Sequence, residues 1–253
     1  EKIGQLFFPI GFSTEKEYLN HLRSLGIGGL FFRPGVAEEV QQTYEYMQRA
    51  SKVPLLTAAN LEDGGNGSSL EGTAFGNQMA VAATNQTSDA YTLGKIASSE
   101  GKAVGVNFGF SPVVDLDLNF RNPITNVRTY GSDVERVIKN AKEYIQAFHD
   151  NGIMTSIKHF PGDGVDERDQ HLLTSINSLS VDNWKKTFGK VYQELIDFGS
   201  KAVMVGHISF PAYSGDEMPA TLSPQLLQDL LRNELGFNGL TITDATPMVG
   251  FCS

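Results

Sequence analysis

The feature that most constrains this chain is a regular alternation of short apolar runs with longer, helix-like stretches. The runs that we expect to be strands are residues 3–10, 29–32, 54–59, 104–110, 153–159, 202–207 and 240–243. The stretches expected to be helices are residues 15–25, 37–50, 88–100, 134–149, 183–198 and 223–234. Strands that alternate with helices at roughly 25–30 residue intervals are typical of βαβ units. The sequence therefore predicts an α/β fold around a parallel sheet.

Polar residues stand where several of these runs end. Asn60 and Glu62 follow the third run, Lys158-His159 closes the fifth, and Asp244 follows the seventh. A (β/α)₈ barrel gathers its catalytic groups at the carboxyl ends of its strands, whereas a doubly wound sheet binds ligands only near a switch point. Polar groups spread over several strands therefore favour the barrel, of TIM type.

The count of strands falls one short of that barrel. Seven runs are present, and the chain stops soon after the last of them. We expect residues 1–253 to be a single catalytic domain that is truncated at its C-terminal end. On this view the natural protein continues past Ser253 with at least one more strand and helix. The alternative is that a partner chain, or a segment taken here as loop, fills the eighth place.

The composition excludes some partners. Acidic residues number 29 and basic residues 20, which gives a net charge of −9. Such a chain is poorly suited to nucleic acid or an anionic membrane surface as its main partner. No apolar run reaches membrane-spanning length. No cluster of Cys and His suggests a metal, so we expect neither a metal nor an organic cofactor. The compartment, bacterial cytoplasm or secreted, stays open.

The densest chemistry lies between residues 158 and 171. The stretch opens with Lys-His-Phe-Pro-Gly-Asp-Gly and ends with Asp169-Gln170-His171. Pro161 is expected to end the preceding strand, since proline has no N–H for the ladder. Gly162 and Gly164 permit unusual backbone angles after it. Solvated loops are often charged, but Lys158-His159 closes a strand whose preceding residues look buried, which is a poor fit to a solvated loop.

This stretch resembles the glycoside hydrolases of family 3, and more narrowly their β-N-acetylglucosaminidase branch. The similarity extends from residues 3–6 to Thr243-Asp244-Ala245. It implies a barrel that acts as a retaining exo-β-glycosidase on terminal β-linked N-acetylglucosamine, through a covalent glycosyl-aspartate. Small N-acetylglucosaminides, peptidoglycan fragments of cell wall recycling among them, are the implied substrates.

The resemblance also assigns the catalytic residues. Asp244 matches the family's nucleophile, and Asp169 and His171 match the acid/base dyad of this branch. A carboxylate suits the first role because it attacks the anomeric carbon and stabilises positive charge on the ring. In the second role, Asp169 would fix the tautomer of His171. The alternatives are an N-cap for Asp244 and a solvated His171, with Asp166 and Glu167 as rival acids.

Lys158, His159 and Arg128 match the family's contacts to sugar hydroxyls; a buried ion pair is the alternative for the first two. Two departures are visible. The family has His where this chain has Asp163, and its Asp-X-Glu-Gly-Gly segment reads Asn60-Leu61-Glu62-Asp63-Gly64-Gly65 without the following Arg. Asn60 and Glu62 are still expected to contact the substrate. The departures leave two other functions open, namely a phosphorylase that uses phosphate in place of water and a catalytically silent sugar-binding barrel.

Overall fold

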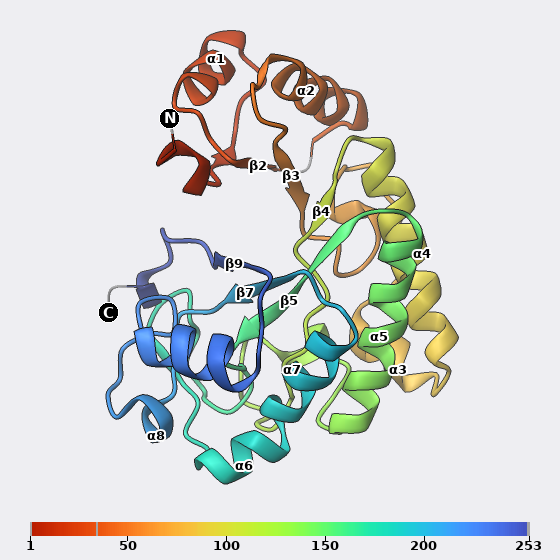
Figure 1. Ribbon diagram of the computed structural model, residues 1–253. Helices are drawn as coiled ribbons and strands as arrows, with labels where there is room; N and C mark the ends of the chain where they lie inside the picture. The colour runs from red at the N-terminus through yellow and green to blue at the C-terminus, as the bar shows by residue number, and fades with distance from the viewer. Residues whose placement is uncertain (1, 34, 252–253) are drawn as a thin grey trace.

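The computed structural model describes residues 2–33 and 35–251. Its centre is a parallel seven-stranded sheet that curls into half of a barrel (Figure 1). The strands, in their order across the sheet, are β1 (Ile10–Gly11), β2 (Gly29–Phe32), β3 (Leu56–Ala59), β4 (Phe108–Gly109), β5 (Met154–Phe160), β7 (Ala202–Val205) and β9 (Leu240–Thr243). Spatial order follows chain order, as the βαβ prediction requires. Within the described residues, β1 and β9 each pair with one neighbour, so the curl is open between them.

The α/β prediction is confirmed in this form. The absence of an eighth unit stays a prediction, and Ser253, after which we expect that unit, lies outside the described residues. A second, two-stranded sheet joins β6 (Ser175–Ile176) to β8 (Ile208–Ser209) in the loops beyond β5 and β7.

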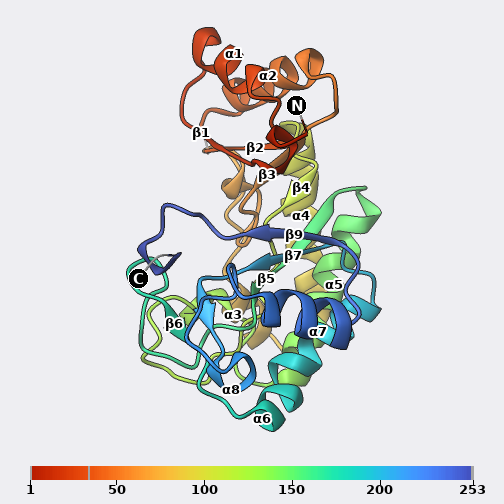
Figure 2. The same ribbon diagram turned by 60° about the vertical axis from the view of Figure 1, so that its left-hand side comes forward.

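Helices cover the outer, convex face of the curl (Figures 1 and 2). They are α1 (Lys16–Ser24), α2 (Ala37–Ala50), α4 (Thr87–Ala103), α5 (Val134–Asp150), α6 (Val181–Lys186), α7 (Phe188–Asp197) and a π-helix, η4 (Gln225–Glu234). Asp133 caps α5 by accepting a hydrogen bond from the Arg136 N–H, as an N-cap residue should. None of the helices among the described residues is long and apolar enough to cross a bilayer.

Three predicted elements were wrong in extent, and one of them is the strand expected at 104–110, of which only β4 (Phe108–Gly109) is a strand. Residues 3–10 form a short 3₁₀ turn, η1 (Gly4–Leu6), and then β1, which begins only at Ile10. Ahead of β1, the carbonyls of Phe7 and Pro9 accept from the N–H groups of Gly28 and Phe31, but Pro9 has no N–H to donate in return. The helix expected at 183–198 is broken at Thr187 into α6 and α7. Trp184 holds α6 to the loop after β5 by a 2.8 Å bond to the Pro161 carbonyl, whereas α7 packs against α5.

The long segment between β3 and α4 contains structure of its own. It holds a 3₁₀ turn, η2 (Gly65–Gly67), and a short helix, α3 (Gln78–Ala83), that Asn77 caps. The remaining short elements are η3 (Asn126–Arg128), α8 (Pro211–Ser214) and η5 (Val249–Phe251).

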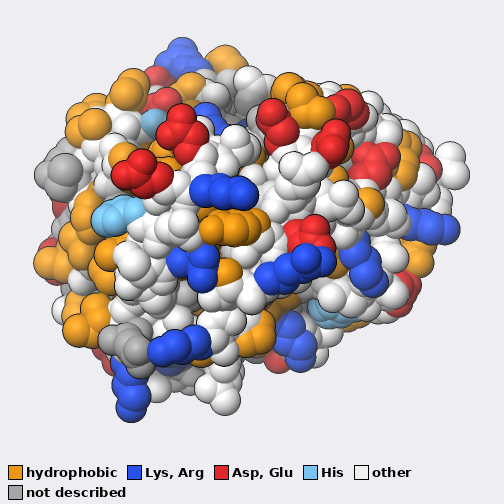
Figure 3. All heavy atoms as spheres, turned by 90° about the horizontal axis from the view of Figure 1, so that it is seen from above, with side chains coloured by type: hydrophobic (Ala, Val, Ile, Leu, Met, Phe, Trp, Pro, Cys, Tyr) orange, Lys and Arg blue, Asp and Glu red, His pale blue; other side chains and the backbone are white. Residues whose placement is uncertain are grey.

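The sheet separates two apolar layers. In β7, Val203 and Val205 join the large core between sheet and helices, while Ala202 and Met204 join a smaller cluster on the concave face. That inner cluster is aromatic: Phe108 and Phe110 meet edge-to-face with ring centroids 5.1 Å apart. This aromatic cluster forms the floor of the hollow at the carboxyl ends of the strands. Seen from above, acidic and basic side chains are interspersed on the outer surface (Figure 3).

Candidate active site

Polar side chains from separate strands meet in one cavity of about 1140 Å³. Asn60 follows β3, Lys158 and His159 lie near the carboxyl end of β5, and Asp244 follows β9. Arg128 and His171 reach the same cavity from the loops after β4 and β5. The carboxyl ends of parallel strands lie at one edge of the sheet, which is why residues so far apart in sequence converge.

Glu62 lies behind the cations and ties them together. Its carboxylate accepts two 2.8 Å bonds from Arg128, through Nε and Nη2, and lies 2.7 Å from the Nζ of Lys158. Lys158 also donates to Oδ1 of Asn60 at 3.2 Å. Burial alone would raise the pKa of Glu62, but the charges of Lys158 and Arg128 hold that pKa well below its ordinary value. The buried ion pair weighed for Lys158 is therefore present, and the same lysine lines the cavity.

Replacing Glu62 by Gln should destabilise the fold strongly. The change leaves Lys158, only 3% exposed at its side chain, without its carboxylate, and removing one partner of a buried pair costs about 3 kcal/mol. Urea unfolding near neutral pH measures this. The pKa of Glu62 is lower in the fold than in the unfolded chain, so its stabilisation is complete at neutral pH and is lost progressively as the pH falls from the ordinary pKa of a glutamate toward the lower pKa of the fold.

A matched control is Glu194→Gln, which breaks an ion pair with Lys142 whose partners are 45% and 31% exposed. Such a pair is worth at most about 1 kcal/mol. Equal losses from the two substitutions would show that Glu62 does not hold the buried cations.

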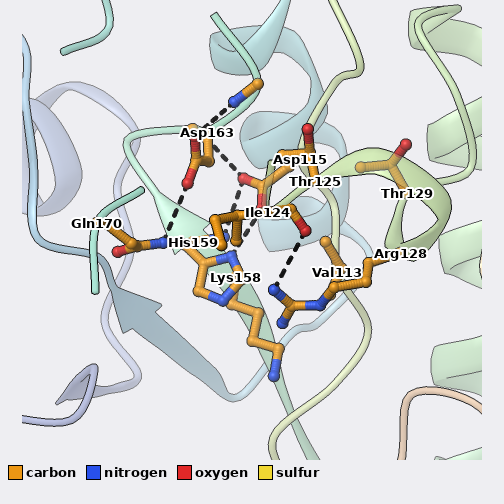
Figure 4. A network of polar contacts seen from close by, with 12 residues as sticks. Val113, Asp115, Ile124, Thr125, Arg128, Thr129, Lys158, His159, Asp163 and Gln170 are labelled. Atoms are coloured by element: carbon orange, nitrogen blue, oxygen red, sulfur yellow. Dashed lines mark hydrogen bonds and ion pairs between the residues drawn. The ribbon is translucent and has the colours of Figure 1, made fainter. Parts of the chain in front are cut away.

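His159 links two carboxylates. Its Nδ1 lies 2.7 Å from Oδ2 of Asp115, and its Nε2 faces Oδ2 of Asp244 at 3.9 Å (Figure 4 shows the Asp115 side). A carboxylate can only accept, so Nδ1 carries a proton toward Asp115. Asp115 also accepts from the His159 N–H at 3.1 Å, which fixes backbone and ring together.

Asp244 is held with one oxygen toward the cavity. Its N–H continues the ladder to the Val205 carbonyl, and its Oδ1 accepts from the Ala245 N–H at 2.8 Å. Oδ2 is the oxygen that faces His159. Burial would raise the pKa of Asp244, but His159, the Ala245 N–H and Lys158 together lower it below the ordinary value. The group is therefore a carboxylate at neutral pH.

The pair Asp169 and His171 has the geometry of a tautomer-fixing dyad. Nδ1 of His171 lies 2.6 Å from Oδ1 of Asp169, which leaves Nε2 as the nitrogen for a ligand. The His171 side chain is 52% exposed and borders the cavity. The rivals Asp166 and Glu167 are not among the described residues that line it. Asp166 accepts bonds from loop N–H groups, and Glu167 pairs with Arg121 on the surface.

Sequence reasoning overlooked three buried residues around this site. Asp115 lies within an apolar run, Pro112-Val113-Val114-Asp115-Leu116, and its isolation there is the signal that marks it. Asn122 and Gln170 sit in polar loops where nothing in the sequence separates them from solvated neighbours. His207, by contrast, is a packed residue whose ring bonds Thr221 and the Ala245 carbonyl.

Asp163, the departure from the family pattern, lies inside this cluster at 1% exposure. Its Oδ1 accepts from Asn122 and from the Gly164 N–H. Its Oδ2 accepts from Gln170, a bond that Figure 4 shows. Burial and the negative charge of Asp115 raise the pKa of Asp163 to about 6, against the opposing effect of His159. The glycines predicted to bend this loop have φ of 123° at Gly162 and 105° at Gly164.

Known proteins resemble the chain over its whole length. It is 47% identical to a β-N-acetylglucosaminidase/β-glucosidase of Cellulomonas fimi, over 100% of this chain and 47% of that protein. It is 32% identical to β-hexosaminidase A of Pseudoalteromonas piscicida, over 85% of this chain and 40% of the relative. The chain thus spans about half the length of the curated relatives it matches.

Solved structures agree. The β-glucoside phosphorylase BglX bound to 2FGlc superposes with a TM-score of 0.95 at 45% identity, covering 99% of this chain and 47% of that one. A family 3 β-N-acetylglucosaminidase from Paenibacillus sp. str. FPU-7 gives a TM-score of 0.93 at 29% identity, covering 99% of this chain and 49% of that one. The family described as "Glycosyl hydrolase family 3 N terminal domain" matches residues 1–252. The chain belongs to the N-terminal domain family of the family 3 glycosyl hydrolases.

Proposed function

We propose that this chain forms the catalytic domain of a retaining exo-β-glycosidase for terminal β-linked N-acetylglucosamine or glucose. The observation that carries the proposal is the convergence on one cavity of an ionised Asp244 and the His171–Asp169 dyad. One carboxylate that stays ionised and one separate acid/base are the two groups that a retaining glycosidase needs.

In the first step, the Asp244 carboxylate attacks the anomeric carbon and forms a glycosyl ester. The bond to the leaving oxygen breaks, and Nε2–H of His171 protonates that oxygen. In the second step, neutral His171 takes a proton from water as the water attacks the same carbon, which releases the sugar and restores Asp244. Asp169 holds the imidazole and stabilises its charged form.

The other cavity residues would bind the sugar ring. Lys158 and Arg128 offer donors to hydroxyl groups, and Asn60 offers both a donor and an acceptor. Glu62 is placed to fix the two cations. His159 is held by Asp115 with Nε2 toward Asp244, where a hydroxyl next to the reacting carbon would lie.

Phosphorolysis is the second candidate, because a chain that is 45% identical and superposes closely is a β-glucoside phosphorylase. A histidine dyad repels an anionic acceptor less than a glutamate would. Attack by phosphate on the glycosyl ester would restore Asp244 and release a sugar 1-phosphate. A general base is not needed for that step, since phosphate is already anionic.

One experiment tests the proposal and its variant together. Purified protein is incubated with nitrophenyl β-N-acetylglucosaminide and with the β-glucoside, in phosphate-free buffer and in phosphate. We expect nitrophenol release from one or both, with free sugar as the product in phosphate-free buffer. Sugar 1-phosphate and a faster turnover in phosphate would assign phosphorolysis. No release in either buffer would contradict both and favour a silent sugar-binding barrel.

A further inference from the structure

Gln170 stands between Asp169 and His171 in sequence but points the opposite way. It is 1% exposed, whereas the side chains of Asp169 and His171 are 26% and 52% exposed. The loop that carries the dyad therefore presents one side chain to the interior and two to the cavity side. No step of the proposed reaction uses Gln170, so its burial calls for another explanation.

The amide of Gln170 is bonded at both ends. Nε2 donates to Oδ2 of Asp163 at 3.1 Å, and Oε1 accepts from the His207 N–H at 3.0 Å (Figure 4 shows the bond to Asp163). Asp163 is itself fixed by Asn122 and by the Gly164 N–H. A Cβ added at Gly206 would lie 3.0 Å from Oε1, so the amide fills its niche closely. Gln170 thus ties the dyad to the start of the same loop, just after β5, and to the loop that follows β7.

A second attachment lies on the other side of the dyad. The Val249 N–H donates to the His171 carbonyl at 2.9 Å, and Thr174 donates to the Gly250 carbonyl at 2.9 Å. These bonds reach the segment that follows Asp244. His171 is half exposed, so its place over the cavity depends on how its backbone is held rather than on packing of its ring.

We propose that Gln170 and Asp163 form a latch that positions the His171–Asp169 dyad over the cavity. The latch also explains why residue 163 is an aspartate. One oxygen of its carboxylate accepts a hydrogen bond from the Gln170 amide, and the other oxygen accepts one from Asn122. The proposal rests on the acid/base role proposed above for His171. Gln170 is a positioning residue in this scheme and touches no reacting atom.

The directions of these bonds allow a sharp test. In Asp163→Asn, the new amide oxygen must stay toward Asn122 to accept its hydrogen bond. The new amide nitrogen then faces the nitrogen of Gln170, so two donors meet and the bond between the two side chains is lost. In Gln170→Glu, a carboxylate meets the Asp163 carboxylate, acceptor against acceptor. In the double variant Asp163→Asn/Gln170→Glu, the new amide donates to the new carboxylate and the bond is restored in reverse. The His207 N–H keeps its acceptor throughout.

Each single variant should lose activity on substrates with poor leaving groups, and the double variant should regain most of it. A displacement of a catalytic group by about 1 Å costs roughly 10²-fold, so we expect losses on that order for alkyl glycosides. Formation of the glycosyl ester from activated aryl glycosides, measured as kcat/KM, needs little acid catalysis and should lose far less. Assays run well above the pKa of about 6 keep Asp163 ionised in the unaltered protein.

The matched control replaces a different acid, one that does not contact Gln170. Asp166 lies on the same loop and accepts from the N–H groups of Arg168 and Ile176. The double variant Asp166→Asn/Gln170→Glu has the same net charge as the reversed latch but pairs no donor with Glu at position 170. Recovery in this control equal to that of the reversed latch would mean that overall charge matters and would overturn the proposal.

Backbone hydrogen exchange over residues 169–174 gives a readout that does not depend on catalysis. We expect faster exchange in both single variants and near-normal exchange in the reversed latch. Unchanged exchange in the single variants, or no recovery in the double variant, would overturn the latch. If exchange follows this pattern but activity shows no dependence on the leaving group, the latch stands and the acid/base role of His171 fails.

Discussion

Replacing Asp244 by Asn is expected to reduce turnover by several powers of ten, the scale of loss when a covalent catalyst is removed. An amide is a poor nucleophile, and it supplies no negative charge to the oxocarbenium-like transition state. The substitution keeps the shape of the side chain. Its Oδ1 can still accept from the Ala245 N–H, so the local backbone should remain in place.

The nucleophile can also be identified directly. A 2-fluoro glycoside with a good leaving group slows the second step more than the first, so a glycosyl ester should accumulate on the unaltered protein. Mass spectrometry of the digested protein should place the added mass on the peptide that contains Asp244. In Asp244→Asn the adduct should be absent.

The matched control is Asp169→Asn, which alters the other carboxylate near the cavity and leaves Asp244 in place. This variant should still form the ester, with turnover impaired through His171. Near-normal turnover in Asp244→Asn, or an adduct on another carboxylate, would contradict the assignment of Asp244.

The fold was predictable because its signals are local and repeated. The helix expected at 134–149 matches α5 (Val134–Asp150) almost to the residue. Strand limits were harder, because a parallel ladder needs a partner at the same register. Residues 3–8 are apolar enough for a strand, yet only Ile10–Gly11 find a partner in β2. Such pairing depends on residues that are distant in the sequence.

The site was predictable only where a residue type stood out from its surroundings. Lys158 and His159 lie near the end of a buried strand, and the structure brings both to the cavity. Asp115 and Gln170 were overlooked because their importance lies in what they contact. Gln170 in particular looks like any polar loop residue until its amide is seen bonded to Asp163 and to the His207 N–H. The sequence carries no pattern for such contacts between loops.

Replacing His171 by Ala should be costly in a way that depends on the substrate. General acid catalysis is worth about 10²–10⁴-fold, and we expect a loss in that range for alkyl β-glycosides. An alkoxide is a poor leaving group and needs the proton from Nε2 as the bond breaks. A dinitrophenolate leaves readily without one, so formation of the glycosyl ester from that substrate should be nearly unaffected.

The second step gives an independent prediction for the same variant. With the activated substrate, the ester on Asp244 should form quickly. Its hydrolysis should then be slow, because the base that activates water is missing. A burst of dinitrophenol followed by slow turnover is therefore expected. Azide is a strong nucleophile that needs no base, so it should speed the slow phase and yield a glycosyl azide.

Glu167→Ala serves as the control, since this carboxylate is the rival acid on the same loop and is paired with Arg121 at the surface. It should leave the ratio of rates on alkyl and activated substrates unchanged. If the loss in His171→Ala were equal on both kinds of substrate and azide had no effect, His171 would not be the acid/base. A shift of that ratio in Glu167→Ala would transfer the role to the rival carboxylate, which would have to move from the surface into the cavity during the reaction.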